Sequence, residues 1–221
     1  MISTTSNPDR NIVLWEIVSV LISCLIAQWT IHTFAGQFKW VGAVPIVLAI
    51  GLMLFSHWER GENLKDLGFR FDNFLPALRL LLLPTAIAIV LVILGSWWWS
   101  ESGFSLRQPG WRFFLVPLWA LVQQYGLQGF INRRAQLAVG PGLKSASIVG
   151  LAFCILHLPS LLLGVLALIG GFVWGKVYQR EPNIFAVALS HTLVSMALSL
   201  SIPKDYANEL RIGFKYFGML I

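Results

Sequence analysis

Residues 145–178, SASIVGLAFCILHLPSLLLGVLALIGGFVWGKVY, decide the fold of this 221-residue chain. The stretch is apolar almost throughout, and it is too long for one membrane-spanning helix, which needs about 20 residues. Pro159 interrupts it, because proline removes a backbone donor and drives the preceding residue away from helical angles. The stretch therefore predicts two apolar helices that break at His157, Leu158 and Pro159.

The rest of the chain has the same apolar character. Hydrophobic residues make up 57% of the sequence and charged residues only 12%, which is more apolar surface than a water-soluble core can bury. Five further apolar stretches are long enough, or nearly so, to cross about 30 Å of hydrocarbon. They are residues 12–34, 40–57, 74–98, 112–131 and 183–201. We therefore predict an all-α, multi-pass transmembrane helical bundle of about seven helices, forming one integral membrane domain over 1–221.

Basic residues in the loops predict the orientation of the chain. With the N-terminus in the cytoplasm, most of the 16 Lys and Arg residues fall on the cytoplasmic side. We therefore predict a cytoplasmic N-terminus. The net charge of +6 follows from this bias and from attraction to anionic headgroups. Membrane lipids are the expected partners, and no nucleic acid is needed to explain the charge.

Polar side chains inside the apolar stretches are costly unless they are satisfied, so they mark candidate sites. Gln123, Gln124 and Gln128 cluster in 112–131, and an α-helix would place Gln124 and Gln128 on one face. One interpretation is hydrogen bonding between helices, which small residues such as Gly126 and Gly129 assist.

Two histidines supply the other candidate groups. Phe153 precedes His157 by four residues, and His191 precedes Ser195 by four, so each pair shares a helix face. A lone histidine inside a membrane helix is more often a packing residue than a ligand. Two of them, one beside a helix break, favour a shared polar cavity with the glutamines.

A zinc site is an alternative use of the histidines. A catalytic zinc ion usually keeps three protein ligands, whereas His157 and His191 have no suitably placed Cys, Asp or Glu beside them. Glu16 and Glu181 could join them only through tertiary folding, and Glu181 instead precedes a helix start that Asn183 would cap. We therefore expect no metal and no cofactor.

The order and spacing of these residues resemble the CAAX protease and bacteriocin-processing family, also called CPBP or Abi. Its motifs are Glu-Glu-x-x-x-Arg, Phe-x-x-x-His and His-x-x-x-Asn. Here they read Gln123-Gln124-Tyr125-Gly126-Leu127-Gln128, Phe153-Cys154-Ile155-Leu156-His157 and His191-Thr192-Leu193-Val194-Ser195. The resemblance implies a CAAX-protease-like fold, in which 112–200 is the core that carries the three motifs.

The resemblance also implies roles for four residues. In that family the first glutamate and the first histidine activate a water that attacks a peptide bond, and the second histidine and the asparagine stabilise the oxyanion. Carried over to this sequence, the catalytic positions are Gln123, His157, His191 and Ser195. A primary amide cannot accept a proton at neutral pH, so Gln123 can orient a water but cannot activate it.

The expected cavity is lined by these four residues together with Gln124, Gln128 and Phe153. Both glutamates and the arginine of the first motif are replaced by glutamines together, which favours a coherent uncharged network. We expect the cavity to open toward the cytoplasmic leaflet, on the side of Arg133 and Arg134, which end that helix.

Three functions remain open. We predict a catalytically impaired relative that uses the family cavity to bind a membrane-anchored peptide, a lipid or a partner's transmembrane helix. The alternative is an active intramembrane endopeptidase that processes prenylated or membrane-anchored peptides, with His157 as its main catalytic group, so enzymatic activity stays open. A transporter lacks support, because the sequence has no paired half-repeats and no charges in the middle of its spans. For residues 204–221 we favour a surface helix over an element that re-enters the membrane.

Overall fold

Every regular element in the described part of the chain, residues 9–33, 43–99, 108–202 and 210–218 of a computed structural model, is helical. The α-helices are α1 (Arg10–Thr33), α2 (Ala43–Glu59), α3 (Phe74–Trp99), α4 (Val116–Gln124), α5 (Arg133–Val139), α6 (Leu143–Ile155), α7 (Leu161–Arg180) and α8 (Ile184–Ser201). Two 3-10 helices, η1 (Trp111–Leu115) and η4 (Gly213–Phe217), and one π-helix, η2 (Tyr125–Asn132), complete the set. Because α4, η2 and α5 form one continuous run, the described residues make seven main helical segments, which confirms the predicted all-α bundle.

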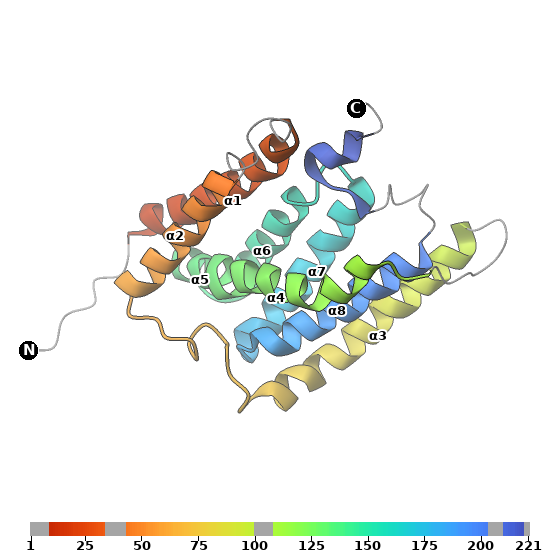
Figure 1. Cartoon of the computed structure of the whole chain (residues 1–221). Helices are drawn as coiled ribbons and strands as arrows, with labels where there is room; N and C mark the ends of the chain where they lie inside the picture. The colour runs from red at the N-terminus through yellow and green to blue at the C-terminus, as the bar shows by residue number, and fades with distance from the viewer. Residues whose placement is uncertain (1–8, 34–42, 100–107, 203–209, 219–221) are drawn as a thin grey trace, which may run out of the picture.

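The helices pack mainly as pairs (Figure 1). α1 lies against α2, α6 against α7, and α3 against α8. The run from α4 to α5 crosses these pairs, contacting α8 with its α4 end and α1 with its α5 end. Side chains such as Phe130 and Ile184, fully buried where the pairs meet, form the centre of the core.

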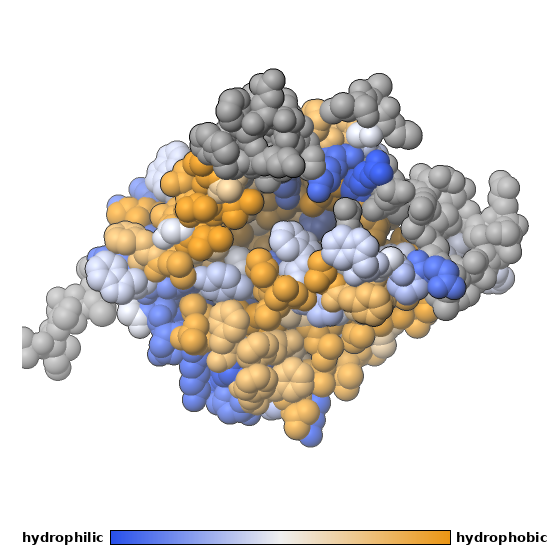
Figure 2. Space-filling view, in the orientation of Figure 1, coloured by the Kyte–Doolittle hydropathy of each residue, from blue (hydrophilic) through white to orange (hydrophobic). Residues whose placement is uncertain are grey.

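The outer surface is apolar in a way that suits lipid and not water. α1, α3, α7 and α8 each contain a stretch long and apolar enough to cross a membrane, and α2 and α6 are apolar but shorter. Large apolar side chains such as Leu83 (69% exposed) and Leu161 (76% exposed) face outward. Figure 2 shows apolar residues over much of the visible face. Since water would oppose such exposure, the chain is a membrane protein.

The predicted break between two apolar helices is confirmed. α6 ends at Ile155 and α7 begins at Leu161, so that His157 lies in the turn between them. Ser160 caps α7, because its hydroxyl oxygen accepts a hydrogen bond from the backbone N–H of Leu163 at 3.4 Å. His157 therefore belongs to neither helix, and it lies inside the bundle.

Two glycines let the helices on either side of this break approach closely. A Cβ added at Gly150 would lie 2.7 Å from the carbonyl oxygen of Leu168. A Cβ added at Gly171 would lie 3.0 Å from Cα of Gly150. Small residues therefore fix the spacing of α6 and α7, as they commonly do between membrane helices.

Asn183 caps α8 as predicted. Its side-chain oxygen accepts a hydrogen bond from the backbone N–H of Ala186 at 2.9 Å. Its amide nitrogen donates to the carbonyl oxygen of Arg70 at 2.7 Å and to the side-chain oxygen of Asn73 at 2.8 Å. The same residue therefore starts α8 and fastens the α2–α3 loop to it.

Candidate functional site

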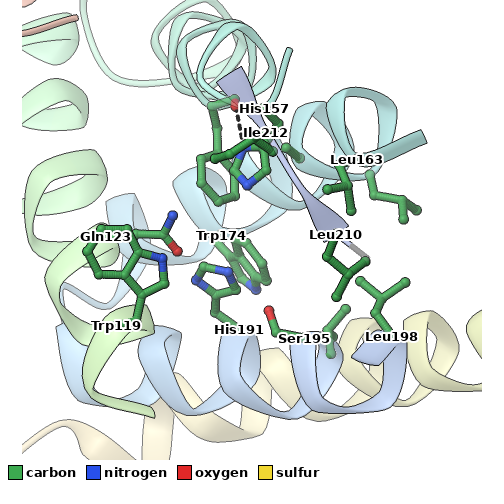
Figure 3. A pocket seen from close by; sticks show the side chains of 14 residues that line it. Trp119, Gln123, His157, Leu163, Trp174, His191, Ser195, Leu198, Leu210 and Ile212 are labelled. Carbon is green, nitrogen blue, oxygen red and sulfur yellow. Dashed lines mark hydrogen bonds between the residues drawn. The ribbon is translucent and has the colours of Figure 1, made fainter. Parts of the chain in front are cut away.

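A cavity of about 190 Å³ lies between α4, α7, α8 and the α6–α7 turn (Figure 3). One part of its wall is polar and the rest is apolar. Its lining residues are Trp119, Gln123, Phe153, His157, Leu163, Leu166, Ala167, Trp174, His191, Val194, Ser195, Leu198, Leu210 and Ile212. The structure thus brings five of the seven predicted site residues to one cavity, from three segments far apart in the sequence.

The ring of His157 has a defined hydrogen-bonding direction. Its Nδ1 lies 2.8 Å from the carbonyl oxygen of Phe153, which can only accept, so Nδ1 carries the hydrogen and donates it. In a neutral imidazole the other nitrogen, Nε2, is then an acceptor. The rings of Phe153 and His157 also meet edge to face, with centroids 4.4 Å apart. His157 is therefore oriented by its own helix and offers an acceptor to the cavity.

His191 is held by three neighbours. The side-chain amide nitrogen of Gln124 lies 3.1 Å from its Nδ1. Its ring packs at 4.7 Å from the ring of Trp174 and edge to face at 5.5 Å from that of Phe153. Because an amide N–H₂ only donates, this contact leaves Nδ1 of His191 as the acceptor and Nε2 as the donor. The two histidines thus offer complementary groups.

Gln123 and Ser195 complete the polar part of the wall. Both side chains line the cavity, one from α4 and one from α8. Among the described residues neither side chain has a hydrogen-bond partner. Unpaired polar groups inside a bundle cost free energy. A ligand that forms hydrogen bonds with these two side chains would offset that cost.

Gln124 and Gln128 do not line the cavity, so the prediction for these two residues is wrong. Both side chains are fully buried, and neither is among the lining residues. Gln128 instead accepts a hydrogen bond from Asn132 at 2.8 Å. The physical reason is the π-helix η2, whose wider turns stack residues five apart and rotate Gln128 away from the face an α-helix would give it.

Gln128 belongs to an uncharged network that joins three helices. Asn132 donates to the carbonyl oxygen of Gly175 at 3.1 Å, and Gln179 donates to Asn132 at 3.1 Å and to Ser145 at 3.0 Å. Gln128 stands where the motif of the CPBP family has an arginine, so an amide occupies the position of a charged group. The sequence indicated an uncharged network through Gln128. It did not indicate Asn132, which follows the first motif, or Gln179, which precedes the third, because neither belongs to a motif.

A buried ionic cluster, which the sequence analysis missed, joins α1 and α2 to α5. It consists of Glu16, His57, Arg60, Glu62, Arg133 and Arg134. Arg134 is fully buried and lies 2.7 Å from a carboxylate oxygen of Glu62 and 3.1 Å from one of Glu16. The available signal was Glu16, a carboxylate within an apolar stretch, where it needs a cation nearby.

Glu62 lies at the start of the α2–α3 loop, outside the spanning helices. Burial raises the pKa of its carboxyl group, but hydrogen bonds from His57, Arg134 and Arg133, with the charge of Arg134, outweigh that effect. The pKa therefore lies well below its ordinary value of 4.5. Glu62 remains ionised and holds the ionic cluster together.

The two carboxylates considered as zinc ligands lie elsewhere. Glu16 pairs with Arg60 and Arg134, and Glu181 accepts a hydrogen bond from Asn73 at 3.2 Å. Within the ranges that the structure describes, no group of three or more His, Cys, Asp or Glu residues is arranged to hold a metal ion. No carboxylate belongs to the described residues of the cavity wall either.

The cavity lies away from Arg133 and Arg134, so the expectation that it opens beside them is wrong. Arg133 donates to the backbone oxygen of Asp66, in the loop attached to the start of α8. The cavity instead uses Trp119 in the first half of α4 and Leu198 near the end of α8. The run contacts α8 through α4 and α1 through α5, which separates its arginines from its cavity-lining half.

The fold and this site define a helical membrane protein with a histidine-lined cavity inside the bundle. Residues 67–197 match the family described as Rce1-like, type II CAAX prenyl endopeptidase Rce1-like, and the chain belongs to this family. The match begins upstream of 112–200 and ends before the cavity-lining residues Leu210 and Ile212. Comparisons with curated proteins and with solved structures give no match.

Proposed function

We propose that this chain is a multi-pass membrane protein that binds the polar group of a membrane-anchored peptide or lipid in its cavity, without the hydrolysis typical of its family. One observation carries the proposal. The cavity wall contains two histidines, a glutamine and a serine, but no carboxylate among its described residues. Gln123 and Gln124 stand where the family motif has glutamates.

The chemistry of these groups favours binding over catalysis. An amide holds a water or a peptide group by hydrogen bonds, but it does not take up a proton at neutral pH. Because Nδ1 of each ring is engaged, Nε2 of His157 is left to accept a hydrogen bond from a ligand, and Nε2 of His191 is left to donate one. A ligand group that both donates and accepts, such as a peptide amide, fits this pair.

Active endopeptidase is the second candidate, and the orientation of His157 favours it. The hydrogen bond from Nδ1 to the Phe153 carbonyl oxygen fixes the ring, as an orienting partner does for a catalytic base. In this alternative His157 takes the proton from water, and His191 with Ser195 stabilises the oxyanion. The described lining residues include no carboxylate that would stabilise the resulting imidazolium.

The orientation in the membrane is part of the proposal. The excess of Lys and Arg in loops that include residues 59–73 supports a cytoplasmic N-terminus. Labelling of single cysteines at residues 64 and 108 with a membrane-impermeant reagent tests it. We expect residue 108 to react from the outside and residue 64 only after permeabilisation, and the reverse pattern would refute the orientation.

A farnesylated CAAX peptide with a photoreactive group beside its amide tests the function. In lipid nanodiscs, we expect the wild type to capture the intact peptide and to crosslink through cavity residues. His157→Ala and His191→Ala should each weaken capture, whereas the lipid-facing control Leu161→Ala should not. Mass spectrometry of the same samples shows whether the peptide is cut. Absence of capture, or cleavage by the wild type that His157→Ala removes, would overturn the proposal.

A further inference from the structure

The C-terminal segment 210–217 forms part of the cavity. Leu210 and Ile212 both belong to the cavity wall, and Figure 3 shows Ile212 beside His157 and Leu210 beside Leu198. Leu210 also packs against the apolar cluster that contains Leu198 and Ile202 at the end of α8. These positions contradict the simple surface helix that we favoured for 204–221, as far as the described residues 210–218 extend.

Contacts with α1 hold this segment in place. The ring of Phe217 lies 6.1 Å from that of Trp29, measured between centroids. A Cβ added at Gly213 would lie 3.1 Å from both Cβ and the carbonyl oxygen of Gln28. Because Gly213 has a φ of +57°, in the left-handed region, and no room for a side chain, glycine suits this close approach.

The helix α1 and the C-terminal segment 210–217 also hold the turn that carries His157. The side-chain amide of Gln28 donates to the carbonyl oxygen of Leu156 at 3.1 Å. The backbone N–H of Gly213 donates to the carbonyl oxygen of Leu158 at 2.9 Å. The peptide groups on both sides of His157 are therefore fixed by α1 and by the C-terminal segment, which both lie outside the matched residues 67–197.

The described part of the cavity wall also carries no formal charge. Its 14 lining residues include no Asp, Glu, Lys or Arg. A carboxylate or an ammonium group would lose its hydration there without gaining a counter-ion, which is strongly unfavourable. An uncharged hydrogen-bonding group, such as an amide, loses far less and gains the acceptor of His157 and the donor of His191.

We propose that Leu210 and Ile212 are specificity-determining residues, which set how large an apolar group can accompany an uncharged amide bound at His157 and His191. This inference rests on the proposed binding function and adds the ligand's chemical class. The polar groups of α4, α8 and the α6–α7 turn hold the amide. Leu210 and Ile212 close the apolar part of the cavity and limit its depth.

Calorimetry of the protein in nanodiscs tests this inference, with empty nanodiscs as the reference. The ligands are primary alkyl amides of increasing chain length and the carboxylates of the same chain lengths. In the wild type we expect affinity to rise about fourfold per added methylene until the cavity is full, and then to level off. Leu210→Ala and Ile212→Ala should move this plateau to longer chains, and Leu210→Trp should move it to shorter ones. Leu161→Ala is the control, because Leu161 faces outward from the start of α7.

The outcomes separate the two proposals. If amides bind and carboxylates do not, and the plateau moves as described, the inference is supported. If amides bind but all variants share the wild-type plateau, Leu210 and Ile212 do not set specificity, while the binding function stands. Equal binding of carboxylates overturns the assigned ligand class. If no amide binds to the wild type, the binding function itself is in error. A melting temperature for each variant identifies loss of affinity that comes from misfolding.

Discussion

The side-chain amide nitrogen of Gln124 lies 3.1 Å from Nδ1 of His191, and Gln124 is fully buried. This contact occupies the second position of the family's Glu-Glu pair. It makes Nδ1 of His191 an acceptor, so that Nε2 carries the hydrogen and faces possible ligands as a donor.

Gln124→Glu should reverse this arrangement. A carboxylate only accepts, so it would draw the hydrogen of His191 to Nδ1 and leave Nε2 without one. Nitrogen-15 NMR of the labelled imidazoles distinguishes the two forms, and His191→Gln identifies the signals. We expect the Nε2–H form in the wild type and the Nδ1–H form in Gln124→Glu. A wild-type signal from the Nδ1–H form would show that the amide oxygen, and not the nitrogen, faces the ring.

Arg134→Met should strongly destabilise the protein. The change leaves Glu62 and Glu16 without their fully buried cation, and breaking a buried ion pair in this way costs about 3–5 kcal/mol. The matched control is Lys65→Met, because Lys65 forms an exposed pair with Asp72 that contributes at most about 1 kcal/mol. Chemical unfolding in detergent measures both. Equal stability of the two variants would refute the structural role of the ionic cluster.

Glu62→Gln should change how stability depends on pH. The folded-state pKa of Glu62 is depressed, so its contribution is fully present above the ordinary value of 4.5 and is lost as the pH falls from that value toward the folded-state pKa. The wild type should therefore exceed Glu62→Gln in stability at neutral pH, and the difference should shrink in acid. Thermal unfolding at a series of pH values checks this. A difference that stays constant in acid would contradict the depressed pKa.

Gly150→Ala should disturb the packing of α6 against α7. The new methyl group would meet a backbone oxygen at 2.7 Å, which cannot move without shifting the helix, and overpacking of this kind costs about 1–3 kcal/mol. Gly51→Ala is the control, since a Cβ at Gly51 meets nothing within 4 Å. Thermal stability separates the two. If Gly150→Ala is as stable as the control, the close approach of these helices is not required.

Local chemistry predicted the parts of the fold that depend on single residues. Pro159 predicted the break beside His157, and Asn183 predicted the start of α8, because a proline and a cap act through their own backbone neighbourhood. The apolar stretches predicted the helical bundle, because the length and composition of each stretch are enough to indicate a helix that crosses the membrane. The two histidines within apolar stretches predicted a shared cavity, and the family resemblance then assigned roles to both in it.

Features that depend on distant partners were not predictable in this way. The π-helix η2 redirected Gln128, and no local pattern distinguishes its wider turns from those of an α-helix. The sequence indicates only that Arg134 ends its helix on the cytoplasmic side, because its partners Glu16 and Glu62 lie far away in the sequence. Leu210 shares a helical spacing with Phe214 and Phe217, which favours a surface helix, so only tertiary packing shows that Leu210 and Ile212 line the cavity.

Gln123→Glu tests most directly the claim that the cavity has kept binding and lost hydrolysis. Gln123 lines the cavity beside the histidines, so a glutamate there would restore a carboxylate where the family motif has one. A general base contributes about 10²–10⁴-fold to such reactions. With a farnesylated CAAX peptide in nanodiscs, we predict no cleavage by the wild type and measurable cleavage by Gln123→Glu. Cleavage by the wild type that Gln123→Glu does not increase and His157→Ala abolishes would contradict the claim.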